Sequence, residues 1–513
     1  MKHYVEKMIM KMKQIVCLFL MAFMLLSSVA CAQSTEDPTG TLNGDASAEV
    51  TEGETGDPNF TCDLPTDLNY GDEIIGILYA NVGGRRDELI SEYGMGVVSD
   101  SVHERNVLVE EQLGVQLEMY PADGDVQLNV VFNNDLTSGL GEYDIISNGT
   151  FKAIIPAMEG RYVNLNELEN INTDKHYWTQ GYNDMVTFTD SEMQFLASGS
   201  MSISMFRYTF FTIYNKDLFK DYQLSDLYET VKQGEWTLDY QYSIVKDHYV
   251  DKDGDSKASV GDFYGFVTGN IVSVDPYMVA SDTHMIIKDN DTSELTYNSD
   301  ALAKLVDLCD KVQLLYNDES TYVYDGGVDD GLGSATLINH FADKNALMAT
   351  TTFISMENNF ERLGALSYGI APMPKFSSIQ KNYYSYVQDQ VSSFGISTVV
   401  SDENRQEMCA AVLEAMAYHS YRLVRPAYYE TVLSERYMQD PQSNEVLDLI
   451  FDSLYFDFSS TCSDIFPNCE IRNNLRPLLS GDSNTIAAST KSWKRIVERK
   501  LDEYNGVLEG LVS

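Results

Sequence analysis

Short apolar runs alternate with helix-like stretches in the first ordered part of this chain. Residues 73–80 (EIIGILYA) form a near-continuous apolar run of strand length, and a helical stretch at 101–113 leads into an alternating run at 115–120. A helical period over 126–140 then precedes a short buried run at 143–146. Strands that alternate with helices form mostly parallel sheets covered by those helices. The sequence therefore predicts an α/β fold.

Polar residues follow two of these predicted strands. Asn81 comes directly after the first strand, and Asn148 and Thr150 come after the third. Ligands of open α/β sheets gather at the carboxyl ends of the strands. These three residues are therefore predicted to bind a ligand.

The N-terminal residues predict export. Lys11 and Lys13 precede an apolar run over 15–30 that is too short for a comfortable membrane span, which is typical of a signal peptide. Residues 28–31 (SVAC) resemble the lipobox of bacterial lipoproteins, in which the cysteine carries lipid, although Ser28 stands where leucine is usual. We expect lipidation at Cys31; the alternative is an ordinary secretory signal that is cleaved near Ala32.

Residues 32–69 are rich in serine, threonine, glycine and acidic residues, and almost no large apolar residue occurs among them. Such a segment cannot form a core and is predicted to be a flexible acidic tether. The remaining chain is too long for a single core, so we expect two or more domains there.

The charge balance excludes one class of partner. Residues 1–31 hold four lysines and one glutamate, so the rest of the chain carries 31 basic and 77 acidic residues. A strongly negative field repels phosphate backbones. We therefore expect no binding to nucleic acids.

The cysteines leave one question open. No CxxC pair occurs, which excludes a zinc ribbon. Cys462 and Cys469 bracket a short segment, so they are either a disulfide-closed turn of an exported protein or two buried thiols.

An acidic loop at 251–262 has the oxygen spacing of a calcium site. The predicted ligands are the side chains of Asp251, Asp253, Asp255 and Asp262 together with the carbonyl of Lys257. The loop departs from the EF-hand pattern, because its glycine is fourth rather than sixth and its twelfth residue is aspartate rather than glutamate. The prediction is a structural Ca²⁺ ion, and the alternative is a solvated acidic turn.

The order of motifs resembles a known family. The lipobox-like segment is followed by EIIGILYA, GVQLEMY, YDIISNGT, TIYNKDLF, GEWT, DKDGDSKASVGDFYGF, HFADKNALMATTTFISMENN and YGIAPMPK. In this order the chain resembles the extracellular solute-binding proteins of bacterial ABC importers, in the type II, mostly sugar-binding group. The resemblance covers the chain from about Asp72 onward and is weakest after Leu423.

This resemblance implies a two-lobed periplasmic-binding-protein-like fold with an interlobe cleft that closes around its ligand. The first lobe would hold residues 72–208 and 383–420, and the second residues 209–374 and 421–513. The implied function is capture of an oligosaccharide-like solute for an ABC permease, by a lipid-anchored receptor on the outer face of the cell membrane.

The resemblance also suggests ligand residues beyond the strand ends. Phe353 is one candidate, although a phenylalanine in an apolar run more often belongs to a core. Gln388 is placed near the hinge, with a solvated turn as the alternative. Trp178 lies between tyrosines in a polar loop and is predicted to be an exposed stacking surface for a sugar.

Several local elements are predicted as well. Residues 205–219 suggest one long strand that runs between the lobes, and 299–315 and 406–419 suggest amphipathic helices. Trp236 stands at the start of a predicted helix, and we expect it to pack as a structural residue.

Two other classes of protein compete with a solute receptor. A glycan-active enzyme is not excluded by counting carboxylates in so acidic a chain. The sequence contains no GxSxG, HExxH or P-loop motif, so we predict that the protein is not an enzyme. A surface adhesion lipoprotein would explain the lipobox and the tether equally well, but it fits the α/β alternation poorly.

Overall fold

The computed structural model describes residues 61–188, 193–289, 294–325, 335–364, 366–432, 441–466 and 471–512. All of them belong to one compact unit, Asp57–Ser513. Within the described chain, no helix combines the length and the apolar character needed to cross a membrane.

The first larger sheet has four strands in the order β14-β3-β1-β2. Strand β1 pairs in parallel with both β2 and β3, and β14 pairs with β3 in the antiparallel sense. The predicted mostly parallel sheet is therefore confirmed. Its strands are β1 (Glu73–Ala80), β2 (Val115–Ala122), β3 (Ile145–Gly149) and β14 (Ser392–Ile396).

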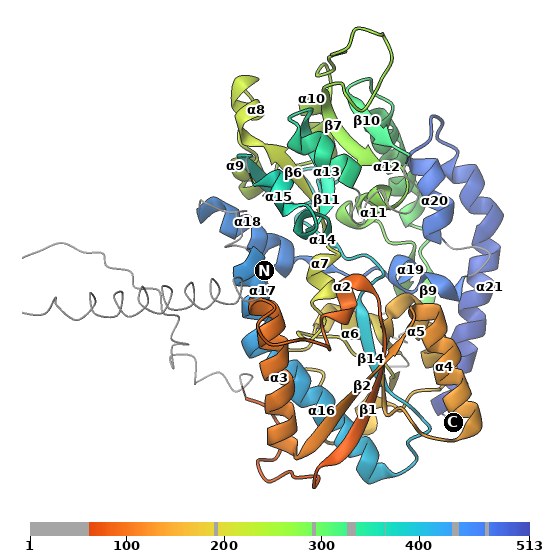
Figure 1. Ribbon diagram of the computed structural model, residues 1–513. Coiled ribbons are helices and arrows are strands. Elements are labelled where there is room, and N and C mark those ends of the chain that lie inside the picture. Colours follow the sequence, from red (N-terminus) through yellow and green to blue (C-terminus); the bar gives the residue numbers. More distant parts are fainter. Residues whose placement is uncertain are drawn as a thin grey trace, which may run out of the picture. The chain divides into compact units, whose positions relative to one another are not determined.

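Helices cover both faces of this sheet (Figure 1). Ile75 and Ile77 of β1 belong to one core cluster, whereas Leu78 and Ala80 belong to the other. This division follows from the alternation of side chains along a strand. The first cluster includes residues of α3 (Val97–Leu113) and α16 (Glu403–His419), and the second includes residues of α4 (Asp125–Ser138) and α5 (Thr150–Met158).

The second larger sheet has five strands in the order β10-β7-β11-β6-β12. Strand β7 pairs in parallel with β10 and β11, while β6 runs antiparallel to β11 and β12. The strands are β6 (Phe210–Asn215), β7 (Tyr264–Gly269), β10 (Thr321–Tyr324), β11 (Ala346–Thr352) and β12 (Tyr368–Ala371).

The predicted amphipathic helices are confirmed as α12 (Ala301–Tyr316) and α16. Helix α10 (Leu238–Val245) begins after Thr237, whose side chain accepts a hydrogen bond from the Tyr240 amide. Trp236 is fully buried and donates its indole N–H to the Pro372 carbonyl at 2.7 Å, so its predicted structural role is also confirmed.

The single long strand predicted over 205–219 is wrong. A helical turn, α7 (Ser204–Arg207), precedes β6, and α8 (Lys216–Asp221) follows it. Asn215 ends the strand because its side-chain oxygen accepts the Leu218 amide and caps the next helix. The many aromatic and β-branched residues thus predicted a buried segment correctly, but the predicted strand was too long.

The C-terminal part adds mostly helices. After α17 (Arg425–Val432) come α18 (Pro441–Asp452), the short β15 (Leu454–Tyr455), α19 (Phe458–Thr461) and α20 (Ile471–Leu479). Strand β15 pairs in parallel with β13 (Ser385–Tyr386).

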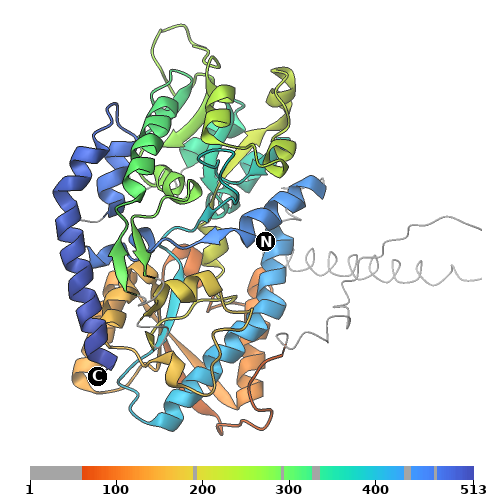
Figure 2. The ribbon, with the colours of Figure 1, turned by 180° about the vertical axis from the view of Figure 1, so that it is seen from behind.

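The last helix, α21 (Ile486–Val512), runs beside a short antiparallel ribbon made of β8 (Ile286–Lys288) and β9 (Leu295–Tyr297) (Figure 2). Asn505 of α21 exchanges two hydrogen bonds with the backbone of Leu295, at 3.0 and 3.1 Å. The same helix contacts α5 and α12. The C-terminal helix therefore touches elements that are associated with both larger sheets.

The first sheet draws its strands from residues 73–149 and 392–396, and the second from residues 210–371. These segments lie inside the predicted first and second lobes, respectively. The lobe boundaries themselves remain a prediction.

Candidate functional site

The carboxyl ends of β1 and β3 lie next to each other, as predicted, but only one of the three polar residues there is open to solvent. Asn81 is exposed, whereas Asn148 and Thr150 are buried. The Asn148 amide donates to the Asn129 side chain at 3.0 Å, and Thr150 contacts the Tyr182 hydroxyl at 3.0 Å. Asn148 and Thr150 thus hold neighbouring elements together in this conformation.

An arginine that the sequence reasoning missed lies at this edge. Arg85 is only 3% exposed, and its Nη2 contacts an Asp125 carboxylate oxygen at 2.5 Å. A Cβ atom added to Gly149 would stand 2.3 Å from Arg85 Nη1, so any larger residue at this position would displace the guanidinium. The signal in the sequence was a pair of arginines in the loop after the first strand, in a chain that is otherwise poor in basic residues.

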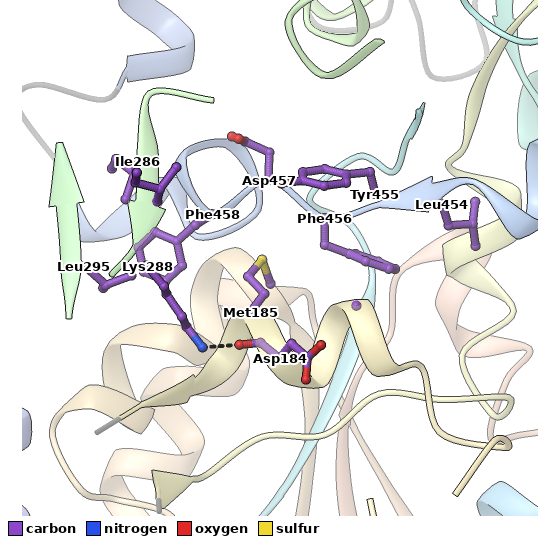
Figure 3. Close-up of a pocket in the computed structure, with 12 residues that line it drawn as sticks. Asp184, Met185, Ile286, Lys288, Leu295, Leu454, Tyr455, Phe456, Asp457 and Phe458 are labelled. Atoms are coloured by element: carbon purple, nitrogen blue, oxygen red, sulfur yellow. Dashed lines mark hydrogen bonds between the residues drawn. The ribbon is translucent and has the colours of Figure 1, made fainter. Parts of the chain in front are cut away.

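A cavity of about 490 Å³ lies between helix α6 (Gln180–Val186) and the β8–β9 ribbon (Figure 3). We call it the ribbon cavity. Its lining residues are Gly181, Asp184, Met185, Ile286, Ile287, Lys288, Leu295, Leu454, Tyr455, Phe456, Asp457 and Phe458. A volume in this range, with aromatic walls and a few polar groups, is typical of small-molecule sites.

The ribbon cavity adjoins the carboxyl edge of β3. Tyr182 of α6 contacts Thr150 through its hydroxyl and packs edge-on against Phe456, with 5.4 Å between the ring centroids. Two side chains, Phe456 and Tyr182, therefore stand between the ribbon cavity and Thr150.

Lys288 forms the polar end of the ribbon cavity. Its ammonium donates to the carbonyls of Asp184 and Thr187, at the end of α6. Burial lowers the pKa of Lys288 to about 8. Asp184 and Lys288 also line a second, more polar cavity of about 740 Å³.

Asp184 offers the cavity an acceptor. Its side chain is exposed, and it accepts no hydrogen bond from any residue that the structure describes. Asp457 is different, because its two oxygens already accept from Ser459, from the Ser460 amide and from His284. Asp184 is thus the carboxylate that can receive a ligand hydroxyl.

Tyr455 supplies an aromatic surface. It is half-buried, and the His284 ring stacks on it with 4.5 Å between centroids and an angle of 21°. Burial lowers the pKa of His284, but its contacts with Asp457 and Asp282 outweigh this effect and raise the pKa overall. The sequence signal was the aromatic run LYFDF at 454–458, in the region where the family resemblance is weakest.

The prediction for Trp178 is wrong. Its side chain is only 2% exposed, and its indole N–H donates to Glu414 at 2.9 Å. Glu414 also accepts the hydroxyl of Tyr177, so the carboxylate satisfies both aromatic polar groups inside the core. Trp178 therefore cannot serve as an exposed stacking surface in this conformation.

Phe353 and Gln388 are also buried. Phe353 stacks on Phe211 at a centroid distance of 4.2 Å and is 1% exposed, so it belongs to the core. The solvated turn considered for Gln388 is wrong, because this residue is 4% exposed and its backbone N–H donates to the Tyr208 carbonyl at 3.1 Å. Gln388 lies beside residues 208–209, where the chain passes toward the second sheet.

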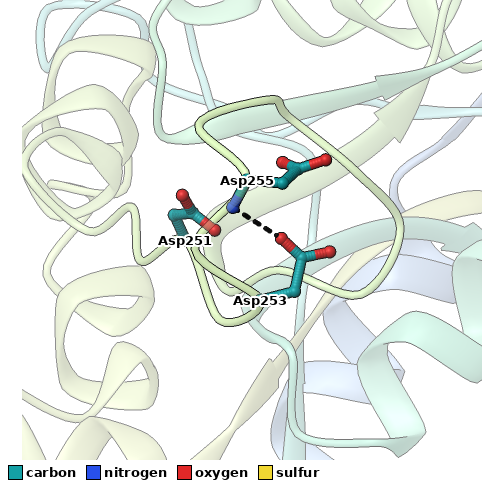
Figure 4. A group of neighbouring side chains, drawn as sticks. All are labelled: Asp251, Asp253 and Asp255. Atoms are coloured by element: carbon teal, nitrogen blue, oxygen red, sulfur yellow. Dashed lines mark hydrogen bonds between the residues drawn. The ribbon is translucent and has the colours of Figure 1, made fainter.

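The acidic loop brings together three of its five predicted ligand residues (Figure 4). Asp251, Asp253 and Asp255 each offer an oxygen within 4.8 Å of the others. Asp262 is fully buried and accepts the amides of Lys252 and Ser259, both at 2.9 Å. It closes the base of the loop and does not belong to the carboxylate group.

Lys257, the remaining predicted ligand, is exposed and donates its amide to Asp255. Cys31 and Cys469 lie outside the described residues. Cys462 is a buried free cysteine, and burial raises the pKa of its thiol.

Comparison with known proteins identifies the fold. No family profile matches the chain, and no curated protein is similar to it in sequence. Among solved structures, a sugar transporter protein of Rhizobium etli in an open conformation matches with a TM-score of 0.52 and 12% identity, covering 84% of this chain and 99% of that one.

Two further structures give the same result. The galacto-N-biose/lacto-N-biose I-binding protein of the Bifidobacterium longum ABC transporter, in complex with lacto-N-biose, matches with a TM-score of 0.51 and 10% identity over 85% of this chain and 98% of its own. UspC of M. tuberculosis matches with a TM-score of 0.51 and 11% identity over 85% and 100%. The predicted α/β, periplasmic-binding-protein-like fold is confirmed: this chain has the fold of ABC-transporter solute-binding proteins.

Proposed function

We propose that the protein is an extracellular solute-binding protein, anchored by lipid at Cys31, that captures a carbohydrate and presents it to an ABC permease. The observation that carries this proposal is the ribbon cavity, which combines the aromatic ring of Tyr455 with the accessible carboxylate of Asp184 in this fold. Carbohydrate sites need aromatic faces for the apolar side of a sugar ring and polar groups for its hydroxyls.

The position of the cavity fits capture by hinge closure. Its floor is α6, which contacts Thr150 at the edge of the first sheet, and its other wall is the β8–β9 ribbon, which follows the second-sheet strand β7 in the chain. A solute that contacts both walls favours the state in which they are close together. The mechanism is reversible binding without covalent chemistry.

Calorimetric titration of the full chain, purified in detergent, with neutral sugars, amino acids and peptides tests the proposal. We expect a sugar to bind and to raise the melting temperature by mass action. Product analysis of the same mixtures separates a receptor from an enzyme, since a receptor returns the sugar unchanged. Binding restricted to peptides, or turnover of the sugar, would overturn the proposal.

Closure and anchoring have their own tests. Small-angle scattering should show compaction when the sugar binds, and an unchanged radius of gyration would contradict hinge closure. In bacteria fed a labelled fatty acid, the native chain should carry the label and Cys31→Ser should not.

We also propose that the Asp251–Asp253–Asp255 group holds a structural Ca²⁺ ion. Three carboxylate oxygens within 4.8 Å of one another are a suitable partial shell for a hard cation. The ion would neutralise the mutual repulsion of these side chains. The hydrogen bond from the Asp255 amide lowers the pKa of Asp253, but desolvation and then the neighbouring carboxylates raise this pKa overall.

A further inference from the structure

An exposed apolar loop, residues 90–97, lies between α2 (Gly83–Arg86) and α3 (Figure 1). It carries four large apolar side chains that are 37%, 79%, 72% and 61% exposed, namely Ile90, Tyr93, Met95 and Val97. No other stretch of eight residues in the described chain holds more than two exposed side chains of this kind. Clustered apolar exposure marks a contact with a protein or a membrane, whereas single exposed residues are ordinary. We call this segment the apolar loop.

Helix α3 holds the apolar loop in place. The Gly94 amide donates to the Asp100 side chain at 2.6 Å, and the Ser99 hydroxyl donates to the Glu92 carbonyl at 3.1 Å. Both bonds join the loop to the first turn of α3. The position of the loop is therefore fixed to the first-sheet part of the chain, while its apolar side chains remain exposed.

The other end of α3 lies where the described chain begins. Gln112, in the last turn of this helix, donates to the Cys62 sulfur at 3.9 Å. A helix of 17 residues is about 25 Å long, so the apolar loop lies about that far from the end of the predicted tether. About 30 residues separate Cys31 from Thr61. A flexible chain of that length would span about 30 Å on average, which brings the loop within reach of a bilayer that holds Cys31.

The chemistry of the loop favours a bilayer with zwitterionic headgroups. Apolar side chains and tyrosine are the residues that proteins insert at the boundary between headgroups and acyl chains. Glu92 and Asp100 stand beside them in a strongly acidic chain, and this negative charge disfavours anionic lipids. The proposed anchor would also keep the loop at a high effective concentration near the bilayer, so a weak contact is sufficient.

We propose that the apolar loop inserts its side chains into the headgroup region of the membrane to which Cys31 anchors the chain. This inference rests on the proposed function, because it requires the lipid anchor, and it adds an orientation to that function. Helix α2 joins the loop to the carboxyl end of β1. Insertion would therefore turn this edge of the first sheet toward the bilayer in which the permease lies.

Fluorescence quenching by brominated lipid tests the insertion. The lipid-anchored full chain is reconstituted in phosphatidylcholine vesicles, with or without bromine on the acyl chains, and flotation measures its attachment. The reporter is Tyr93→Trp, and the matched control is Ile379→Trp, at an apolar residue that is 89% exposed and lies outside the loop. The emission of the unchanged chain is subtracted. We expect bromine to reduce the added emission about twofold or more for Tyr93→Trp and to leave that of Ile379→Trp nearly unchanged.

A double substitution tests the contribution of the neighbouring side chains. Met95→Ser with Val97→Ser, made in the Tyr93→Trp chain, should restore most of the quenched emission, because the loop loses apolar surface. Equal quenching at positions 93 and 379, or none at 93, in chains that float with the vesicles would overturn the insertion and leave the receptor function standing. These vesicles contain no permease, so a loop that docks only on protein gives this negative result. Failure of the native chain to float would remove the anchor and the insertion together, while sugar binding is measured separately.

Discussion

Asp275 and Arg476 form an ion pair that is almost completely removed from solvent. The guanidinium donates two hydrogen bonds to the carboxylate, from Nε to Oδ1 at 2.7 Å and from Nη2 to Oδ2 at 2.5 Å. The side chain of Arg476 is 12% exposed and that of Asp275 is 2% exposed. The pair joins the start of α11 (Pro276–Ala280) to the C-terminal helix α20. It therefore ties the second-sheet region to the C-terminal part of the chain.

Removing one partner of this pair should be costly. Asp275→Asn leaves a buried guanidinium without its counter-charge, and we expect a loss of about 3–5 kcal/mol in the free energy of unfolding. The exposed pair of Lys232 and Glu445 is the matched control, and Lys232→Ala should cost about 0–1 kcal/mol. Urea denaturation of both variants measures the difference, and equal losses would show that burial of the pair does not matter.

His284 makes stability depend on pH. Its Nδ1 contacts Asp457 and its Nε2 contacts Asp282, each at 3.2 Å, while the rings of Tyr455 and Tyr384 pack against it. These carboxylates raise the pKa of His284 above its ordinary value despite the opposing effect of burial. The folded state therefore binds this proton more tightly than the unfolded state does.

The contribution of His284 to the free energy of unfolding should be complete below its pKa in the unfolded state, which is about 6.5. It should disappear as the pH rises through the higher pKa of His284 in the folded state. We expect His284→Gln to melt below the native protein by the largest margin near pH 5, with a smaller margin in alkaline solution. Calorimetric melting between pH 5 and 9 measures this margin. His103→Gln, at an exposed position, controls for loss of an imidazole. A margin that does not change with pH would contradict the proposed charge interaction.

At the scale of single elements, the acidic loop between α10 and β7 is the clearest test of local prediction. Its three grouped carboxylates accept backbone amides within the loop, and Gly254 adopts a φ of +76° that suits a tight turn. Asp262 was predicted as the twelfth ligand, but it is directed to the base of the loop instead. The spacing of the acidic residues therefore predicted the group of three carboxylates but not the role of Asp262.

Calcium should stabilise the chain through this loop. We expect millimolar Ca²⁺ to raise the melting temperature relative to chelator, because an ion that binds only the folded state shifts unfolding by mass action. The double variant Asp253→Asn with Asp255→Asn should abolish the increase. Asp482→Asn, an exposed aspartate outside the loop, should preserve it. Identical melting curves of the native chain in calcium and in chelator would remove the site.

The strands and helices that the sequence predicted well share one property: their side-chain periodicity is local. Strand β1 was predicted with its observed bounds, and α12 and α16 were predicted within a few residues, because a repeating apolar face is visible in a short window. The predicted strand over 205–219 failed because the chain changes conformation at both ends of β6 through short helices. Helix α8 begins at the cap that Asn215 provides. This cap depends on one residue in a segment that is buried throughout, so the apolar pattern does not reveal it.

At the scale of the whole molecule, Lys288 connects parts that are distant in sequence. Its ammonium joins the β8–β9 ribbon to the end of α6, and α21 contacts the same ribbon from another side. The ammonium also lies over the Phe188 ring, with Nζ 5.5 Å from the ring centroid. The lysine therefore closes one end of the ribbon cavity.

Loss of this contact should loosen the ribbon. Lys288→Met retains an apolar side chain but removes the ammonium, so we expect faster amide hydrogen exchange in β8, in β9 and at the end of α6. Exchange elsewhere, for example in α16, should not change. Lys220→Met is the control for an exposed lysine. Unchanged exchange in the ribbon would show that apolar packing alone holds it in place.

The periodicity of apolar residues and the order of short motifs were sufficient to predict an α/β fold of the solute-binding type, because both are encoded along the chain within local windows. Which aromatic rings line a cavity was not encoded in this way. Trp178 lies in a polar stretch of sequence yet is buried against Glu414, and Tyr455 lies in the least familiar region yet lines two cavities. Burial depends on which distant segments pack together, and it was the return of residues 441–466 against α6 and the ribbon that created the cavities.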